Sequence, residues 1–234
     1  MIKLEHTEVV GWEHAIRGMR NPMNSWDKSD SYWTHIEDPE TLQTAKFECF
    51  VGDNDLALMR KLRNAGTDHR KYMRMITVYA DITAPLYWWK EFDTYKVGTV
   101  ANSCSTMHKI HAKEFTLDDF SHEHLLPNVV GGSSGRTLVK HSLGMLDDVV
   151  FILNAYRDDY LATKDKRYWW QMIQLLPSSY NQKRTVMLNY EVLANMYHSR
   201  KDHKLDEWRD LCGWIETLPY SELITRKEQN RADE

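Results

Sequence analysis

Small hydroxyl and amide side chains gather with basic residues between Lys90 and Ile110 of this 234-residue chain. The segment reads KEFDTYKVGTVANSCSTMHKI and has few large aliphatic residues. Hydroxyl, amide and ammonium groups can hold a phosphate or the polar edge of a heterocycle. The same groups can instead satisfy backbone atoms at a helix end or in a loop. Residue chemistry alone leaves both interpretations open.

A second polar segment, residues 177–200, carries Asn189, Asn195 and Arg200 among large apolar residues. The spacing predicts a helix over 182–200, with Lys183 adding positive charge near its start. Polar groups on a buried helix must find partners, either on neighbouring helices or on a ligand. Without other information the structural interpretation is favoured.

Three other patterns carry weaker signals. GGSSGR at 131–136 has the composition of a phosphate-binding loop without its order, which favours a mobile surface loop that could act as a lid. His122 and His124 have a spacing that suits a metal on a strand, but no third ligand lies nearby in the sequence. His108 and His111 meet the same objection, so no metal site is expected.

The elements that position these segments form an α+β pattern, with strands early and helices later. Alternation of apolar residues predicts strands over 45–51 and 73–83. Asp53 is expected to cap a helix that Gly66 closes, and another helix is expected to begin after Pro85. Apolar stripes predict further helices over 143–156, 165–176, 182–200 and 203–216. In the pairs Trp88–Trp89 and Trp169–Trp170, we expect one ring in the core and the other at a subunit interface.

Composition limits the class of protein. Hydrophobic residues make up 42% of the chain and charged residues 27%, which is typical of a globular protein. We expect one domain over residues 1–225 and a charged tail over 226–234. A net charge of -4 argues against specific nucleic-acid binding. The chain has no apolar run long enough to span a membrane, no secretory signal and three widely spaced cysteines, so we expect a cytoplasmic protein.

Two stretches together resemble the flavin-dependent thymidylate synthase family. Ala84-Pro85 begins the first, and Lys90, Glu91 and Phe92 fall on the family's basic-Gln-aromatic positions. Leu176-Pro177 begins the second, in which Asn189, Asn195 and Arg200 match the family's spacing. The resemblance covers most of residues 45–210 and implies the family's fold, a central antiparallel sheet with flanking long helices.

Several motif residues differ from the family's. Thr94, Tyr95 and Lys96 replace an Arg-His-Arg triplet, and Met107 stands where the following motif ends in Arg. Glu191 replaces the Arg of the second stretch. The family's Phe-Glu-His, which contacts flavin, is absent around residues 70–72. These changes remove much of the positive charge that holds dUMP in the family.

The resemblance implies FAD as cofactor and a pyrimidine nucleotide as substrate, with methylation of dUMP by methylenetetrahydrofolate and NADPH if the family's reaction is retained. It also implies a homotetramer. The alternative is a non-catalytic or repurposed oligomeric member of the fold that binds another nucleotide or a protein partner. By this resemblance the catalytic residues are Lys96 and Arg200. The implied cofactor contacts are Thr94, Tyr95, Lys96, Asn102, Asn189 and Asn195. The implied substrate contacts are Glu91, Thr99, Ser103, Ser105, Lys183 and Arg200.

Overall fold

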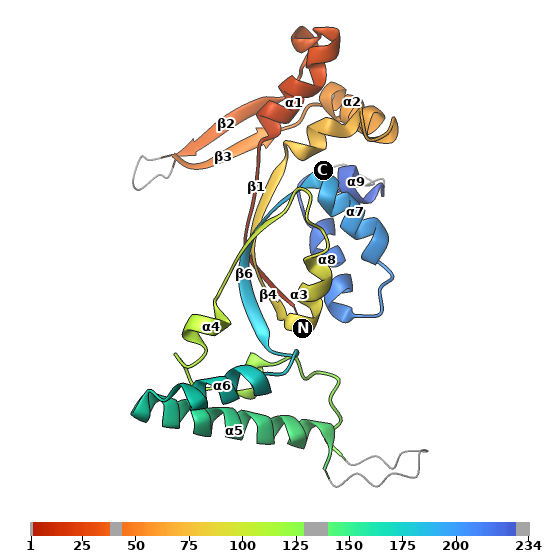
Figure 1. Ribbon diagram of the computed structural model, residues 1–234. Helices are drawn as coiled ribbons and strands as arrows, with labels where there is room; N and C mark the ends of the chain where they lie inside the picture. The colour runs from red at the N-terminus through yellow and green to blue at the C-terminus, as the bar shows by residue number, and fades with distance from the viewer. Residues whose placement is uncertain (1, 38–43, 129–139, 228–234) are drawn as a thin grey trace. The chain divides into compact units, whose positions relative to one another are not determined.

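The computed structural model describes residues 2–37, 44–128 and 140–227 (Figure 1). The GGSSGR segment and most of the predicted tail lie outside these ranges. The described chain folds into two compact units. The first comprises Met1–Leu4, Asp81–Thr94 and Ala101–Thr185, and the second comprises Glu5–Ala80, Tyr95–Val100 and Val186–Glu234. A single domain over 1–225 stays a prediction.

A four-stranded antiparallel sheet has the strand order β1-β4-β6-β5. Its strands are β1 (Lys3–Val10), β4 (Thr77–Pro85), β6 (Asn181–Asn189) and β5 (Val100–Ser103). In β4 every second residue from Val78 to Ala84 is buried, as the alternation predicted. The strand starts later than expected because Arg70–Arg74 forms a 3-10 helix, η3, which the backbone bond from Met75 to Tyr72 closes.

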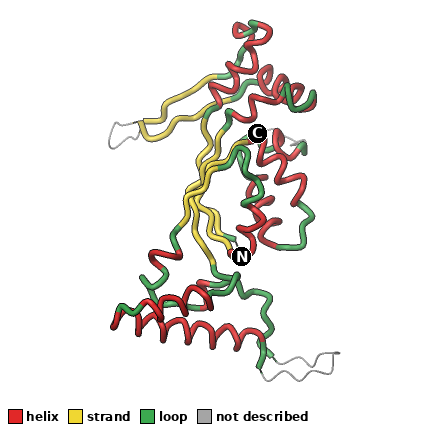
Figure 2. The backbone as a smooth tube through the Cα atoms, in the orientation of Figure 1, coloured by secondary structure: helices red, strands yellow, loops and turns green. Residues whose placement is uncertain are grey.

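A separate hairpin, drawn in yellow in Figure 2, consists of β2 (Tyr32–Glu37) and β3 (Thr44–Phe50). The two strands pair antiparallel, with Trp33 opposite Cys49. The Tyr32 and Phe50 rings stack at 4.9 Å. The strand predicted over 45–51 is therefore confirmed.

Helix α2 (Asp53–Asn64) begins at the expected place with a different cap. Gly52 is the N-cap residue, and the Asp30 carboxylate accepts the Asn54 and Asp55 amides at 2.9 and 3.1 Å. The expected role of Asp53 was therefore wrong, because a carboxylate from a distant segment takes it. A Cβ at position 52 would lie 2.2 Å from Asp30 Cγ, so only glycine fits.

The first unit contains α3 (Leu86–Phe92), α4 (Thr106–Lys109), the 3-10 turn η4 (Leu117–Asp119), α5 (Ser142–Thr163) and α6 (Lys166–Leu175). Helices α5 and α6 lie side by side (Figure 1). Their core is a cluster of buried apolar side chains: Ile110, Phe115, Phe120, Leu146, Leu153 and Met172. The expectation that one ring of the first Trp pair lies at an interface was wrong for this chain, because Trp88 and Trp89 are both buried and pack edge-to-face at 4.9 Å.

The second unit contains α1 (Trp12–Arg20), η1 (Asn21–Met23), η2 (Trp26–Lys28), α7 (Tyr190–Arg200), α8 (Asp206–Glu216) and α9 (Glu222–Thr225). The helix predicted over 182–200 was half wrong, since residues up to Asn189 form β6. Val186 and Leu188 are buried at a period of two, which is strand spacing. The Asn189 side chain accepts the Val192 amide at 2.9 Å and so starts α7.

The helices expected over 165–176 and 203–216 are confirmed as α6 and α8. Within the described ranges, no helix combines the length and apolar character that crossing a membrane requires.

Candidate functional site

A tight turn between Tyr95 and Thr99 lies against the start of α7 in the second unit. Gly98 has a φ of +80°, and a Cβ there would lie 2.5 Å from the Asn189 Nδ2 atom. Glycine is therefore required twice, by its backbone angle and by the close approach. The Thr99 hydroxyl donates to the Tyr95 carbonyl and closes the turn. The turn thus brings three of the predicted site residues together.

Arg200, at the end of α7, is held on aromatic rings. Its Nε donates to the Tyr95 hydroxyl at 2.9 Å. Its guanidinium carbon lies 4.6 Å from the Trp208 ring centroid and 5.7 Å from that of Tyr95. The two rings meet edge-to-face at 5.9 Å. Stacking of this kind fixes the plane of an arginine while leaving its charge in place.

Two other predicted residues of the second unit are exposed. Lys96 follows Tyr95 in the turn, and it makes no ion pair or hydrogen bond within the described residues. Asn195 lies on an exposed face of α7, which contradicts its expected place on a buried face. Lys96 and Asn195 are therefore exposed to solvent, whereas Tyr95 and Arg200 belong to a partly buried cluster.

Glu191, at the position where the sequence resemblance implies an arginine, forms ion pairs of its own. Glu191 accepts from Arg70 Nε at 3.0 Å and from Arg74. Burial acts to raise the pKa of Glu191, but the hydrogen bonds from Arg74 and Arg70 outweigh it and hold the pKa below its ordinary value. This carboxylate stays ionised and is neutralised by its two arginine partners.

In the first unit, Lys183 pairs with the Asp81 carboxylate at 3.0 Å. The Lys183 carbonyl accepts the Cys104 amide at 2.9 Å, so the predicted residues Asn102, Ser103 and Ser105 run beside β6. Both Asn102 and Ser103 are exposed on β5. Three predicted substrate and cofactor residues therefore lie on this pair of strands, Asn102 and Ser103 on β5 and Lys183 on β6, and Ser105 follows just after β5.

Two hydroxyls in this unit perform structural tasks. The Ser105 side chain accepts the His108 amide at 3.1 Å and caps α4. The Thr94 hydroxyl donates to the Glu91 carbonyl at 2.7 Å, at the end of α3. Both hydroxyls therefore satisfy nearby backbone groups, which is the structural alternative that the sequence left open.

Arg184 is a residue that sequence reasoning passed over as a site. It pairs with Asp93 at 2.7 Å, donates to the Gln182 side chain at 3.0 Å and lies 4.1 Å over the Trp89 ring. The sequence signal for Arg184 was its place next to Lys183. Had this segment been assigned as a strand, the two side chains would have been expected on opposite faces of the sheet.

Two cavities open on the described surface, and none of the predicted site residues lines either. One, of about 900 Å³, lies in the second unit between Trp12, Phe50 and Tyr220 and includes the acids Glu8 and Glu13. The other, of about 600 Å³, lies in the first unit at the turn between α5 and α6.

No cluster of three or more metal-ligating His, Cys, Asp or Glu side chains occurs in the described ranges. One ring nitrogen of His122, Nδ1, lies 2.8 Å from the Phe120 carbonyl.

Neither a protein-family model nor a curated protein sequence matches the chain. Solved structures do match. Thymidylate synthase X (ThyX) from Helicobacter pylori with FAD and dUMP is 14% identical, covers 96% of this chain and 97% of its own, and gives a TM-score of 0.63. The UMP/dUMP methylase PolB from Streptomyces cacaoi, bound with 5-Br dUMP, is 13% identical, covers 97% and 94%, and gives 0.57. The chain therefore has the ThyX-like fold that the sequence resemblance predicted.

Proposed function

We propose that this chain is a divergent, cytoplasmic thymidylate-synthase-like flavoprotein that binds FAD and a pyrimidine nucleotide. The observation that carries the proposal is a fold match extending over nearly the whole of both chains, to proteins solved with FAD and dUMP. Fold alone does not fix function, so the argument depends on the residues that this chain keeps.

Arg200 supports nucleotide binding through its fixed geometry. Its Nε is engaged by Tyr95, and its plane is set by Trp208. A guanidinium positioned in this way loses little entropy when it binds a phosphate. Lys96 adds a second, exposed cation from the turn that carries Tyr95. We assign phosphate binding to Arg200 and Lys96.

The same residues are consistent with FAD, although less fully than in the family. The Asn189 amide nitrogen occupies the space that a Cβ at Gly98 would take, so the Gly98 backbone and this amide lie close together. Tyr95, from the same turn as Gly98, offers a ring and a hydroxyl. Bound reduced flavin supplies the electrons that the methylation of dUMP requires, and methylenetetrahydrofolate supplies the carbon. At position 191 the chain departs from the residue that the resemblance implies, because a carboxylate paired with Arg70 and Arg74 stands in place of an arginine.

The first test is whether the purified protein is yellow. Flavin absorbs between the near-ultraviolet and the blue, so the spectrum reports it directly. Calorimetry with FAD and with dUMP then measures affinity in the wild type, Arg200→Lys and Arg200→Ala. Removing one charge-assisted phosphate contact should weaken dUMP binding about tenfold or more.

Arg17→Ala is the matched control, because Arg17 is exposed and its nearest polar partner, His14, lies at 3.4 Å. The control should bind dUMP as the wild type does. A colourless protein that binds neither FAD nor dUMP contradicts the proposal. Unchanged dUMP affinity in Arg200→Ala contradicts the assigned phosphate contact.

A homo-oligomer, as the tetramer of the resemblance implies, is also part of the proposal. Helix α5 exposes Met145, Phe151 and Ile152, with Phe151 at 75% exposure, although its other face packs in the core. A helix that is apolar on several faces is normally covered on all of them. Light scattering should find an oligomer that Phe151→Asp weakens, and a monomeric wild type would refute this part.

One observation favours the alternative, a non-catalytic or repurposed member of the fold. Glu191 forms ion pairs with Arg70 and Arg74 at the position where the resemblance implies an arginine that binds the nucleotide. The discriminating assay is rescue of a thymidine-requiring bacterial strain. Rescue that is lost on changing Lys96 or Arg200 to Ala would overturn the alternative, whereas flavin binding without rescue supports it.

A further inference from the structure

The turn between α5 and α6 carries two lysines whose charges are not neutralised. Lys164 ends α5 with a φ of 58°, and Lys166 begins α6. The acid between them, Asp165, is occupied by Arg167, which contacts it through Nε at 2.9 Å and Nη2 at 2.6 Å. Neither lysine has a carboxylate partner within the described part of the chain. The result is local positive charge at the mouth of the 600 Å³ cavity.

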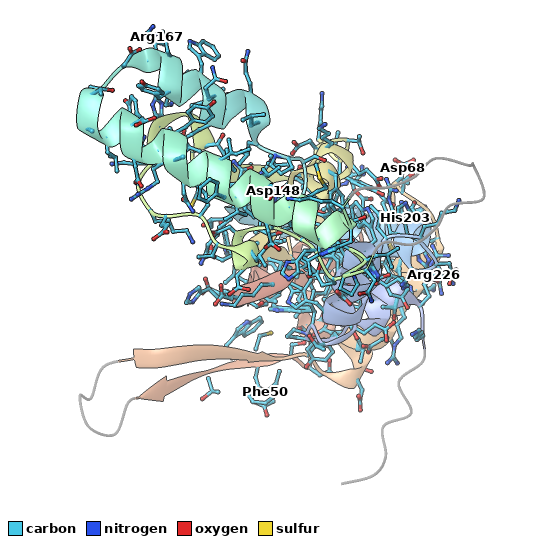
Figure 3. The ribbon with its side chains drawn as sticks, turned by 90° about the horizontal axis from the view of Figure 1, so that it is seen from below. Phe50, Asp68, Asp148, Arg167, His203 and Arg226 are labelled. Carbon is cyan, nitrogen blue, oxygen red and sulfur yellow. The ribbon has the colours of Figure 1, made fainter. Side chains whose placement is uncertain are left out.

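The lysines lie over aromatic rings instead. Lys164 Nζ is 5.7 Å from the Tyr160 ring centroid, and Lys166 Nζ is 5.9 Å from that of Trp169. Exposed cation–π contacts of this kind are weak, about 0.5–1 kcal/mol each, so an anion can draw the ammonium groups away. Figure 3 shows Arg167 at the outer edge of the helix pair, which places the start of α6 in reach of solvent.

The rings themselves are anchored. Trp169 Nε1 donates to the Met107 carbonyl at 3.3 Å, and the His111 ring meets Tyr160 edge-to-face at 4.9 Å. His108 completes the lining. Buried His111 Nδ1 has no hydrogen-bond partner within the described residues. Anchored rings beside exposed cations offer a planar ligand a stacking surface without the cost of ordering the rings.

We propose that this cavity binds a nucleoside monophosphate, with its phosphate on Lys164 and Lys166 and its base against Trp169 or Tyr160. A volume of about 600 Å³ suits a ligand of this size. The lining contains no Asp or Glu to repel a phosphate. It also contains no Asn or Gln, so we expect stacking on a ring to hold the base more than hydrogen bonds to its edge.

This site does not depend on the proposed function, because none of the residues assigned to FAD or dUMP lines it. AMP is the probe for this cavity. Because FAD contains an AMP half, AMP can also enter a flavin site, so the two sites are separated by variants: the loss of both lysines should weaken AMP binding, and Arg200→Ala should leave it unchanged. Failure of dUMP binding and failure of AMP binding are thus distinguishable outcomes.

The test is calorimetry on the full chain with AMP, adenosine and inorganic phosphate. AMP should bind more tightly than either of its parts, because the base and the phosphate contribute together. The double variant Lys164→Ala/Lys166→Ala should lose about tenfold in AMP affinity and little in adenosine affinity. Both lysines are exposed, so the variant should fold normally. Lys61→Ala, an exposed lysine of α2, is the matched control.

Trp169→Leu tests the stacking half of the proposal. It should weaken AMP by about tenfold and leave phosphate binding unchanged. Acetylation of lysines followed by mass spectrometry localises the ligand, since AMP should protect Lys164 and Lys166 but not Lys61.

Three results with small ligands would overturn the proposal, and a fourth, with RNA, would do so as well. The first three are undetectable AMP binding, AMP binding that survives loss of both lysines, and inorganic phosphate binding as tight as AMP. Tighter binding of a single-stranded RNA than of AMP would place a polymer on this surface and would also overturn it.

Discussion

Replacing Glu191 with Gln tests whether the ion pairs of this carboxylate with Arg70 and Arg74 stabilise the protein. The substitution keeps the shape of the side chain and removes its charge. Glu191 is 14% exposed, Arg70 18% and Arg74 50%, so solvent screens the Arg74 bond more than the Arg70 bond. Charge-assisted hydrogen bonds contribute about 1.5–3 kcal/mol when buried, and exposed pairs less than about 1 kcal/mol. We expect a loss of about 1–2 kcal/mol at pH 7.

The pH dependence follows from the direction of the shift. The pKa of Glu191 lies below its ordinary value of 4.5 in the folded chain, since the bonds from Arg74 and Arg70 outweigh the effect of burial. The unfolded chain therefore binds the proton first as pH falls. The stabilisation is complete above about pH 4.5 and is lost as pH drops through the folded pKa.

Thermal unfolding of wild type and Glu191→Gln at pH 7 should differ by about 3–6 °C. The difference should shrink between pH 4.5 and pH 3. Glu114→Gln, an exposed glutamate with no partner among the described residues, is the control and should change neither value. Equal melting temperatures at pH 7, or a difference that persists unchanged at pH 3, would refute the reasoning.

Three further outcomes are expected. Asp55→Ala should cost about 3–5 kcal/mol in urea unfolding, because it leaves Arg20, bonded to that carboxylate at 2.6 Å, as an unpaired buried charge; a cost below about 1 kcal/mol would show that the network relaxes. Gly98→Ala should destabilise by at least about 1 kcal/mol, since positive φ and contact with a neighbouring amide both oppose a Cβ, and unchanged stability would contradict that geometry. Iodoacetamide at pH 8 should label exposed Cys104 before Cys49, whose pKa burial raises to about 11, and mass spectrometry that finds equal labelling would contradict the described burial.

The sequence predicted correctly those helices and strands whose apolar residues have a spacing that fits only one type of secondary structure. The apolar stripe of α8, from Trp208 to Ile215, fits only a helix, and the structure has one there. The segment 182–200 misled because Val186 and Leu188 continue into Val192 without a change of composition. Asn189 lies at the boundary between β6 and α7, and asparagine is a common N-cap residue. Its role as a cap becomes clear only once the residues before it are known to form a strand.

The site was less predictable than the fold because its geometry is tertiary. Nothing in the sequence places Trp208 under Arg200, or pairs Glu191 with Arg70 and Arg74 more than a hundred residues away. The lysines at the α5–α6 turn were overlooked for the same reason. A cavity forms there only when the two helices pack with the segment around His111, and periodicity does not encode that contact.

The cap of α2 has a consequence for how the chain opens. The first turn of that helix is held by Asp30, and Asp55 within it is held in turn by Ser29 and Ser31. If residues 29–31 separate from the first turn of α2, the hydrogen-bonding groups on both segments lose their partners. The two segments should therefore unfold together in one cooperative event. The amides of Asn54 and Asp55 should therefore exchange with solvent deuterium at a common rate, slower than fraying of a free helix end would allow.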